Sequence, residues 1–168
     1  MTSAYLRRAL EVIEAATEGM SEDQLVRHPD GKWSTALILE HLALAFTGTT
    51  KGLARCLEAG RSSASAPTLK HRVTTAIVVG LGYLPSGAQA PERTRPKGIP
   101  AEKVRQTVHE SLIAMDEALA RCEQRFGHRV AVLDHPILGP LSVRQWRKFH
   151  WVHARHHLKQ VAQLRARR

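Results

Sequence analysis

Four histidines fall within eight consecutive positions of the stretch Phe149-His150-Trp151-Val152-His153-Ala154-Arg155-His156-His157, near the C-terminus. In an α-helix, residues four apart lie on the same face, about one turn and about 6 Å from each other. His153 and His157 have this spacing. Their two imidazoles can therefore share one metal ion.

Apolar residues continue the same helix face on both sides of the histidines. Ring nitrogens that face a core need partners, because a buried polar atom without one costs on the order of 1 to 3 kcal/mol. Hydrogen bonds to carboxylates or carbonyls of a facing helix would satisfy them, and so would a metal ion; both explanations stay open. The positions on this face, at intervals of three and four, are Val143, Trp146, His150, His153, His157, Val161 and Leu164.

Three earlier segments show the same helical periodicity, and each begins at a recognisable helix start. Ser3 and Ser34 stand at the N-cap positions of the first two segments, and Pro100 suits the first turn of the third. Ser142 stands at the N-cap position of the final helix. The sequence thus predicts long helices over about 3–19, 35–59 and 101–126, in addition to the final helix after Ser142. Between them it predicts a short turn after Ser21, a short helix within 73–84 and an irregular connection over 130–140.

The fold class expected from four amphipathic stripes is all-α, most simply a four-helix bundle, which builds metal sites from side chains on facing helices. About forty residues separate the second long helix from the third, which allows a long crossover. A chain of 168 residues fits a single domain over 1–168. No apolar run approaches the roughly 20 residues of a membrane span and no secretory signal is apparent, so we expect a cytoplasmic protein without membrane contact.

A third histidine lies on an inward-facing stripe of the second long helix. His41 follows Ile38 and precedes Ala45 and Thr49 on this stripe. His150, one turn before His153, could support a ligand by a hydrogen bond, shuttle protons or serve as an alternative ligand.

Other candidate residues favour structural explanations. We expect Glu40 to form a surface or interhelical salt bridge, and Trp33 and Trp146 to be packing anchors near the ends of the bundle. His156 is rotated by about 100° from His157 and should face a neighbour or solvent. Asp134 and His135 fit turn chemistry, or the mouth of a pocket. Cys56 and Cys122 lie within helical patterns and are expected to be reduced core residues.

The last 27 residues contain eight Lys or Arg residues and no Asp or Glu, in a chain of net charge +10. A basic helix can bind nucleic acid. Its cations, which include Arg144, Arg155, Lys159 and the tail Arg165, Arg167 and Arg168, fall largely away from the histidine stripe and could also solvate the outer face. The same charge could attract an anionic thiol cofactor or a carboxylated substrate.

Two parts of the chain carry motifs of a known superfamily. In the first, Gly31-Lys32-Trp33-Ser34 leads into Ile38-Leu39-Glu40-His41-Leu42; in the second, His135-Pro136-Ile137-Leu138-Gly139-Pro140-Leu141-Ser142 leads into Trp146 and His153-Ala154-Arg155-His156-His157-Leu158-Lys159-Gln160. This pattern resembles the DinB-like superfamily, in a branch related to thiol-dependent S-transferases. The resemblance covers both ends of the chain, while residues 60–98 contribute almost nothing to it.

The resemblance implies an up-down-down-up four-helix bundle with a long crossover between its second and third helices. It also implies a divalent metal, zinc or nickel, on His41, His153 and His157. Characterised relatives include bacillithiol transferases and mycothiol-dependent isomerases, so a low-molecular-weight thiol and an electrophile become the expected partners. Whether two chains form a homodimer stays open.

Three histidine ligands leave one position of a tetrahedral zinc for water or substrate, as in catalytic sites. We therefore expect a metal-binding protein that activates a thiol or water for transfer or hydrolysis. Two alternatives stay open: a nucleic-acid-binding module that uses the basic final helix, and a non-catalytic bundle that the metal only stabilises. The sequence contains no Ser-His-Asp motif, glycine-rich phosphate loop or Cys-x-x-Cys pair that would indicate other chemistry.

Overall fold

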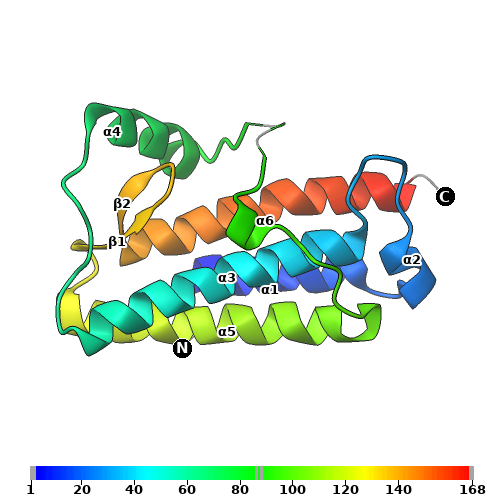
Figure 1. Cartoon of the computed structure of the whole chain (residues 1–168), viewed down its shortest axis with the longest axis horizontal. Helices are drawn as coiled ribbons and strands as arrows, with labels where there is room; N and C mark the ends of the chain where they lie inside the picture. The colour runs from blue at the N-terminus through cyan, green and yellow to red at the C-terminus, as the bar shows by residue number, and fades with distance from the viewer. Residues whose placement is uncertain (1–2, 86, 88, 167–168) are drawn as a thin grey trace.

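Four long helices lie along the long axis of the molecule in a computed structural model that describes residues 3–85, 87 and 89–166 (Figure 1). They are α1 (Ala4–Thr17), α3 (Thr35–Glu58), α5 (Ala101–Phe126) and α6 (Val143–Ala166). The shorter elements are α2 (Glu22–Val26), α4 (Leu69–Thr75), a π-helical turn (Ala76–Gly80) and a 3-10 turn (Glu92–Thr94). The described chain is thus mostly helical, as expected. Arg167 and Arg168 of the basic tail lie outside the described residues.

The predicted N-caps hold the starts of the long helices. The hydroxyl of Ser34 accepts a hydrogen bond from the Leu37 amide at 3.2 Å, and that of Ser142 accepts one from the Gln145 amide at 3.3 Å. Such caps satisfy amides that have no partner within the helix. The start of α3 thus sets the position of His41 along that helix. The start of α6 sets the positions of His153 and His157 in the same way.

The core lies between two pairs of helices. α3 packs along α5, and α1 packs along α6. Their apolar stripes supply fully buried side chains such as Leu6, Leu42, Phe46, Leu112 and Met115. Cys56 and Cys122 are free and buried in this core, which confirms the expectation of reduced core cysteines. Among the described residues, no helix is both long enough and apolar enough to cross a membrane.

A small sheet replaces the irregular connection that we expected between α5 and α6. Strand β1 (Ala131–His135) pairs antiparallel with β2 (Gly139–Ser142). Val132 and Leu141 are fully buried and tie the hairpin to the core. The prediction was wrong here because Pro136 and Pro140 interrupt the strand pattern, although proline is tolerated in an edge strand.

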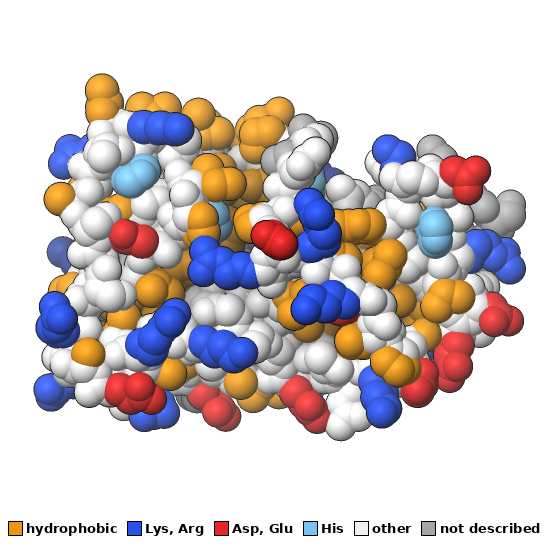
Figure 2. Space-filling model, in the orientation of Figure 1, with side chains coloured by type: hydrophobic (Ala, Val, Ile, Leu, Met, Phe, Trp, Pro, Cys, Tyr) orange, Lys and Arg blue, Asp and Glu red, His pale blue; other side chains and the backbone are white. Residues whose placement is uncertain are grey.

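The connection between α3 and α5 crosses the outside of α6 before it returns to α3. Lys148 donates a hydrogen bond to the Gly80 carbonyl at 3.0 Å, and Arg155 donates one to the Gly82 carbonyl at 2.8 Å, which holds the far part of the crossover on α6. Exposed apolar side chains, including Leu69, Val73, Ile77 and Leu81, follow this segment. Figure 2 shows hydrophobic side chains gathered along the upper edge, where α4 lies in Figure 1.

Candidate metal centre

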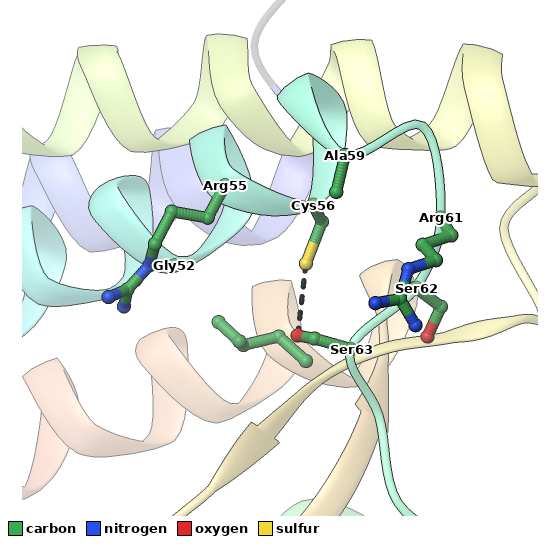
Figure 3. Close-up of a pocket in the computed structure, with 8 residues that line it drawn as sticks. Gly52, Arg55, Cys56, Ala59, Arg61, Ser62 and Ser63 are labelled. Carbon is green, nitrogen blue, oxygen red and sulfur yellow. Dashed lines mark hydrogen bonds between the residues drawn. The ribbon is translucent and has the colours of Figure 1, made fainter.

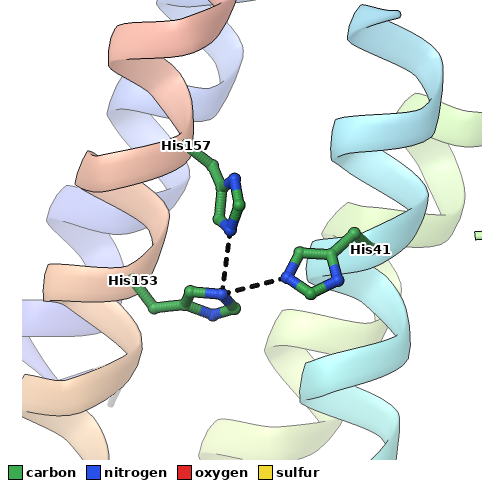
Figure 4. A group of neighbouring side chains, drawn as sticks. All are labelled: His41, His153 and His157. Carbon is green, nitrogen blue, oxygen red and sulfur yellow. Dashed lines mark hydrogen bonds between the residues drawn. The ribbon is translucent and has the colours of Figure 1, made fainter. Parts of the chain in front are cut away.

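Three histidine rings from two helices converge in the interior, between α3 and α6 (Figure 4). The Nε2 atom of His153 lies 3.1 Å from the Nε2 atom of His41 and 3.1 Å from that of His157. The three ligand atoms all lie within 4.8 Å of one another. The structure thus brings together the three histidines that the sequence singled out, and this group could hold a metal ion.

Hydrogen bonds at the opposite ring nitrogens orient two of the three imidazoles. The Nδ1 atom of His41 lies 2.7 Å from the Thr94 carbonyl oxygen, and that of His157 lies 2.9 Å from Oε1 of Gln160. Both oxygens are acceptors, so each Nδ1 must carry the proton and each neutral ring presents an Nε2 lone pair to the centre. Metal-binding histidines are usually oriented by such partners.

The spacing and the lone pairs of the donor atoms fit a metal ion. Zinc–nitrogen bonds of about 2.0 to 2.1 Å in a tetrahedral site would place neighbouring nitrogens about 3.3 Å apart. Nε2 of His153 lies at a similar distance, 3.1 Å, from Nε2 of each of the other two histidines, and the third pair lies within 4.8 Å. Lone pairs that face one another at this distance repel unless a proton or a cation lies between them. The Nδ1 atom of His153 is buried without a hydrogen-bond partner among the described residues, so this ring lacks the outer partner that the other two have.

Burial keeps the three rings in the neutral form that binds metals. It lowers the pKa of His41, against the opposing effect of the Thr94 carbonyl. It lowers the pKa of His157 to about 4, although the bond to Gln160 acts in the other direction. Burial, followed by the neighbouring histidines, holds the pKa of His153 well below its usual range. Near pH 7, metal binding therefore does not require the loss of a proton from a charged imidazolium ring.

Aromatic side chains wall the three histidines. The Trp33 ring lies 5.2 Å from the His41 ring and stacks at 6.5 Å from the His157 ring, while Phe149 stacks on His153 at 5.5 Å. His41 and His153 are only 4% and 8% exposed, whereas His157 is half-buried. Trp33, expected to be a packing anchor, is thus also a wall of the site. The half-buried His157 is the histidine of the three that lies nearest to solvent.

Glu40 does not form the surface or interhelical salt bridge that we expected. Its side chain is 4% exposed, and its carboxylate accepts hydrogen bonds from three backbone amides. The donors are Lys97 at 2.9 Å, Gly98 at 2.8 Å and Ile99 at 3.2 Å. The prediction was wrong because the partners are main-chain groups of the returning crossover.

The remaining candidates lie beside the centre or away from it. His150 is buried, and its Nε2 atom lies 3.0 Å from the hydroxyl of Thr49. Nδ1 of His135 accepts hydrogen bonds from the next residues of the β1–β2 turn, and Asp134 accepts one from the Ser65 amide. Turn chemistry and loop packing therefore account for Asp134 and His135. His156 is half-buried, with its ring against that of His157.

A separate cavity of about 320 Å³ opens near the end of α3 (Figure 3). None of the three histidines lines it. Its polar wall includes Arg55, Arg61 and Ser62, and the Sγ atom of Cys56 lies 3.1 Å from the hydroxyl of Ser63. Cys122 does not line this cavity; burial raises the pKa of its thiol to about 11, so a nucleophilic thiolate is not expected at Cys122.

A family model described as "protein of unknown function (DUF1569)" matches residues 6–164. No curated protein and no solved structure matched the chain.

Proposed function

We propose that this chain, which belongs to the DUF1569 family of proteins of unknown function, binds a divalent metal on His41, His153 and His157 and uses it to activate a low-molecular-weight thiol or water. One observation carries the proposal: three Nε2 atoms from α3 and α6 converge, with 3.1 Å between His153 and each of the other two. Zinc and nickel both accept imidazole ligands.

The arrangement of the helices supports a DinB-like single domain. In Figure 1 the chain runs in one direction along α1 and α6 and in the opposite direction along α3 and α5. This order corresponds to the up-down-down-up four-helix bundle of that superfamily. Residues 59–100 form the long connection between the second and third long helices.

The proposed reaction follows from an incomplete ligand set. When bound, a metal with three histidine ligands would lower the pKa of a thiol or water at its remaining position and so supply a nucleophile near neutral pH. The protein's own contribution is to keep His41, His153 and His157 neutral, orient two of them through Thr94 and Gln160, and surround them with Trp33 and Phe149. Transfer of the thiol to an electrophile, or hydrolysis by water, would follow.

The charge of α6 supports an anionic thiol or substrate better than nucleic acid. Its residues 143–166 include six Lys or Arg residues and no Asp or Glu. Four of these cations already contact protein oxygens: Arg147 with Glu123 and Asp116, Lys148 with Gly80, Arg155 with Gly82, and Arg165 with Ala16. A duplex would have to compete with these contacts, whereas a small anion needs only the field of the helix.

Metal content is the direct test. Protein purified without chelator and reconstituted with zinc or nickel should contain about one metal per chain by plasma mass spectrometry. His41→Ala and His153→Ala should lose it, whereas His128→Ala, which removes an exposed histidine, should keep it. Parent protein that takes up neither metal would refute the metal centre.

Activity is tested separately on the loaded protein. We expect metal-dependent consumption of an electrophilic aryl halide with one member of a panel of low-molecular-weight thiols, or hydrolysis of an activated ester or amide. Loss of turnover in His153→Ala but not in His128→Ala would assign the reaction to this centre. A loaded parent without turnover in either assay would leave the metal as a stabilising element and contradict the catalytic part of the proposal.

A further inference from the structure

The last part of the crossover, residues 91–99, lies against α3 beside the metal centre; we refer to it as the strap. It begins with the 3-10 turn Glu92–Thr94. Both the amide and the hydroxyl of Thr94 donate to the Pro91 carbonyl, at 2.9 and 3.0 Å. This turn leaves the Thr94 carbonyl free to accept from His41, at 2.7 Å. The strap therefore supplies the outer partner of one proposed ligand.

The other end of the strap is held by a buried carboxylate. Oε1 of Glu40 accepts from the Lys97 amide, and Oε2 accepts from the amides of Gly98 and Ile99, at distances of 2.8 to 3.2 Å. Hydrogen bonds to an ionised carboxylate are roughly twice as strong as those between neutral groups. No Lys, Arg or His side chain forms an ion pair with Glu40 in the described part of the chain. Among the described residues, the hydrogen bonds to the Glu40 carboxylate thus all come from the strap.

Glu40 and His41 are adjacent in α3, so the anchor of the strap and the ligand that the strap orients share one turn of one helix. The connections form a closed ring that runs from Glu40 to residues 97–99, back along the strap to Thr94, and through His41 to α3. If the strap moved, the Thr94 carbonyl would leave Nδ1 of His41. The imidazole of His41 could then adopt either neutral tautomer, and only one of these presents an unprotonated Nε2 to the centre.

We propose that Glu40 is a positioning residue of the metal centre. Its carboxylate fixes the strap so that Thr94 holds His41 with the proton on Nδ1 and the lone pair on Nε2. This proposal rests on the proposed metal-binding function, but it also makes a claim about the metal-free protein. Loss of such an outer contact typically weakens metal binding by roughly 10- to 100-fold.

The main test compares Glu40→Gln with Glu58→Gln, which makes the same change at an exposed position of the same helix. The amide introduced by Glu40→Gln would keep one oxygen acceptor and turn an NH₂ group toward the strap amides. Zinc titration against a chromophoric chelator should give a dissociation constant about 10- to 100-fold higher for Glu40→Gln and an unchanged one for Glu58→Gln. Equal circular dichroism spectra would establish that both variants are folded.

Nitrogen-15 NMR of the metal-free protein supplies a readout that a merely structural role would not change. The parent should show His41 as a single tautomer with the proton on Nδ1, assigned with His41→Gln. Glu40→Gln should show a mixture of tautomers and faster hydrogen exchange at the amides of residues 97–99. An unchanged tautomer and unchanged zinc affinity would overturn the proposal.

A second variant perturbs the strap without touching α3. Gly98 has φ +89°, a conformation that an L side chain rarely adopts, and a Cβ there would meet nothing within 4 Å. Gly98→Ala should therefore strain only the strap. It should shift zinc affinity and the His41 tautomer in the direction expected for Glu40→Gln, and it gives a test that does not depend on whether Glu40→Gln folds. If the parent binds no metal, the proposed function fails, while a tautomer shift in Glu40→Gln still supports positioning of His41 by Glu40.

Discussion

His41 and His153 lie 112 positions apart in the chain, yet their Nε2 atoms are 3.1 Å apart across the interface of α3 and α6. Both rings are buried and neutral, and neither Nε2 faces a carboxylate or a carbonyl among the described residues. A cation shared with His157 would satisfy all three nitrogens at once, which a hydrogen bond between two rings cannot do.

Zinc should stabilise the folded protein. Binding to the native state alone contributes about 2.7 kcal/mol when free metal is at 100 times its dissociation constant. For a chain of this size, that corresponds to an increase in Tm of roughly 5 to 10 °C. Differential scanning fluorimetry with and without zinc should show the increase in the parent and in His128→Ala but not in His153→Ala. An equal increase in all three proteins would place the effect outside this centre.

Gln160 should strengthen metal binding through His157. Its Oε1 atom accepts from Nδ1 of His157 at 2.9 Å, so Gln160→Leu removes the group that orients this ring. We expect zinc affinity to fall by roughly 10-fold. Gln163→Leu makes the same change at an exposed position of α6 and should leave the affinity unchanged. Equal affinities in the two variants would show that Gln160 does not orient the ligand.

Acid should destabilise the metal-free protein through its buried neutral histidines. Burial lowers the pKa of His150 to about 3 and that of His135 to about 4, whereas both take up a proton near pH 6.5 when the chain is unfolded. Between these values the unfolded state binds more protons. The free energy of unfolding should therefore fall as pH decreases below about 6.5, by about 1.4 kcal/mol per pH unit for each such histidine.

Urea unfolding at pH 7, 6 and 5 measures this slope in the metal-free protein. His150→Leu removes one titrating group from among the rings of Phe46, Trp146 and Phe149. The Thr49 hydroxyl, which contacts His150, keeps its hydrogen bond to the Ala45 carbonyl. Its stability should depend less steeply on pH than that of the parent. A slope that does not change would mean that His150 is not a buried neutral group.

Two glycines one turn apart on α3 should respond to alanine in opposite directions. A Cβ at Gly48 would meet nothing within 4 Å, so Gly48→Ala should stabilise the helix by roughly 0.5 to 1 kcal/mol. A Cβ at Gly52 would lie 2.5 Å from Cδ2 of Leu133, so Gly52→Ala should destabilise the protein by roughly 1 to 3 kcal/mol through overpacking against β1. Chemical denaturation of both variants tests the pair. Stabilisation by Gly52→Ala would show that Leu133 adapts freely.

The long helices were predictable from the sequence because local signals define them. Ser34 and Ser142 form the caps that their positions predict, and apolar stripes mark the buried faces. The histidine group was predictable for a related reason: helical spacing places His153 beside His157, and His41 stands out on an apolar stripe. Gln160, three residues after His157, could have been found by the same spacing.

The contacts of the crossover could not be found in this way. Thr94 contributes a backbone carbonyl, and Lys97, Gly98 and Ile99 contribute backbone amides, which every residue except proline possesses. Residue type therefore gives no signal for these partners of His41 and Glu40. The hairpin of β1 and β2 was missed because its prolines resemble those of an irregular loop.

The division of the proposed ligands between α3 and α6 has a consequence for the order of events during synthesis. A ribosome makes chains from the N-terminus, and domains form as their parts emerge. His41 leaves the ribosome more than a hundred residues before His153 and His157. The nascent chain therefore presents only one of the three proposed ligands until α6 is made, and a metal could bind the complete set only after His157 has emerged.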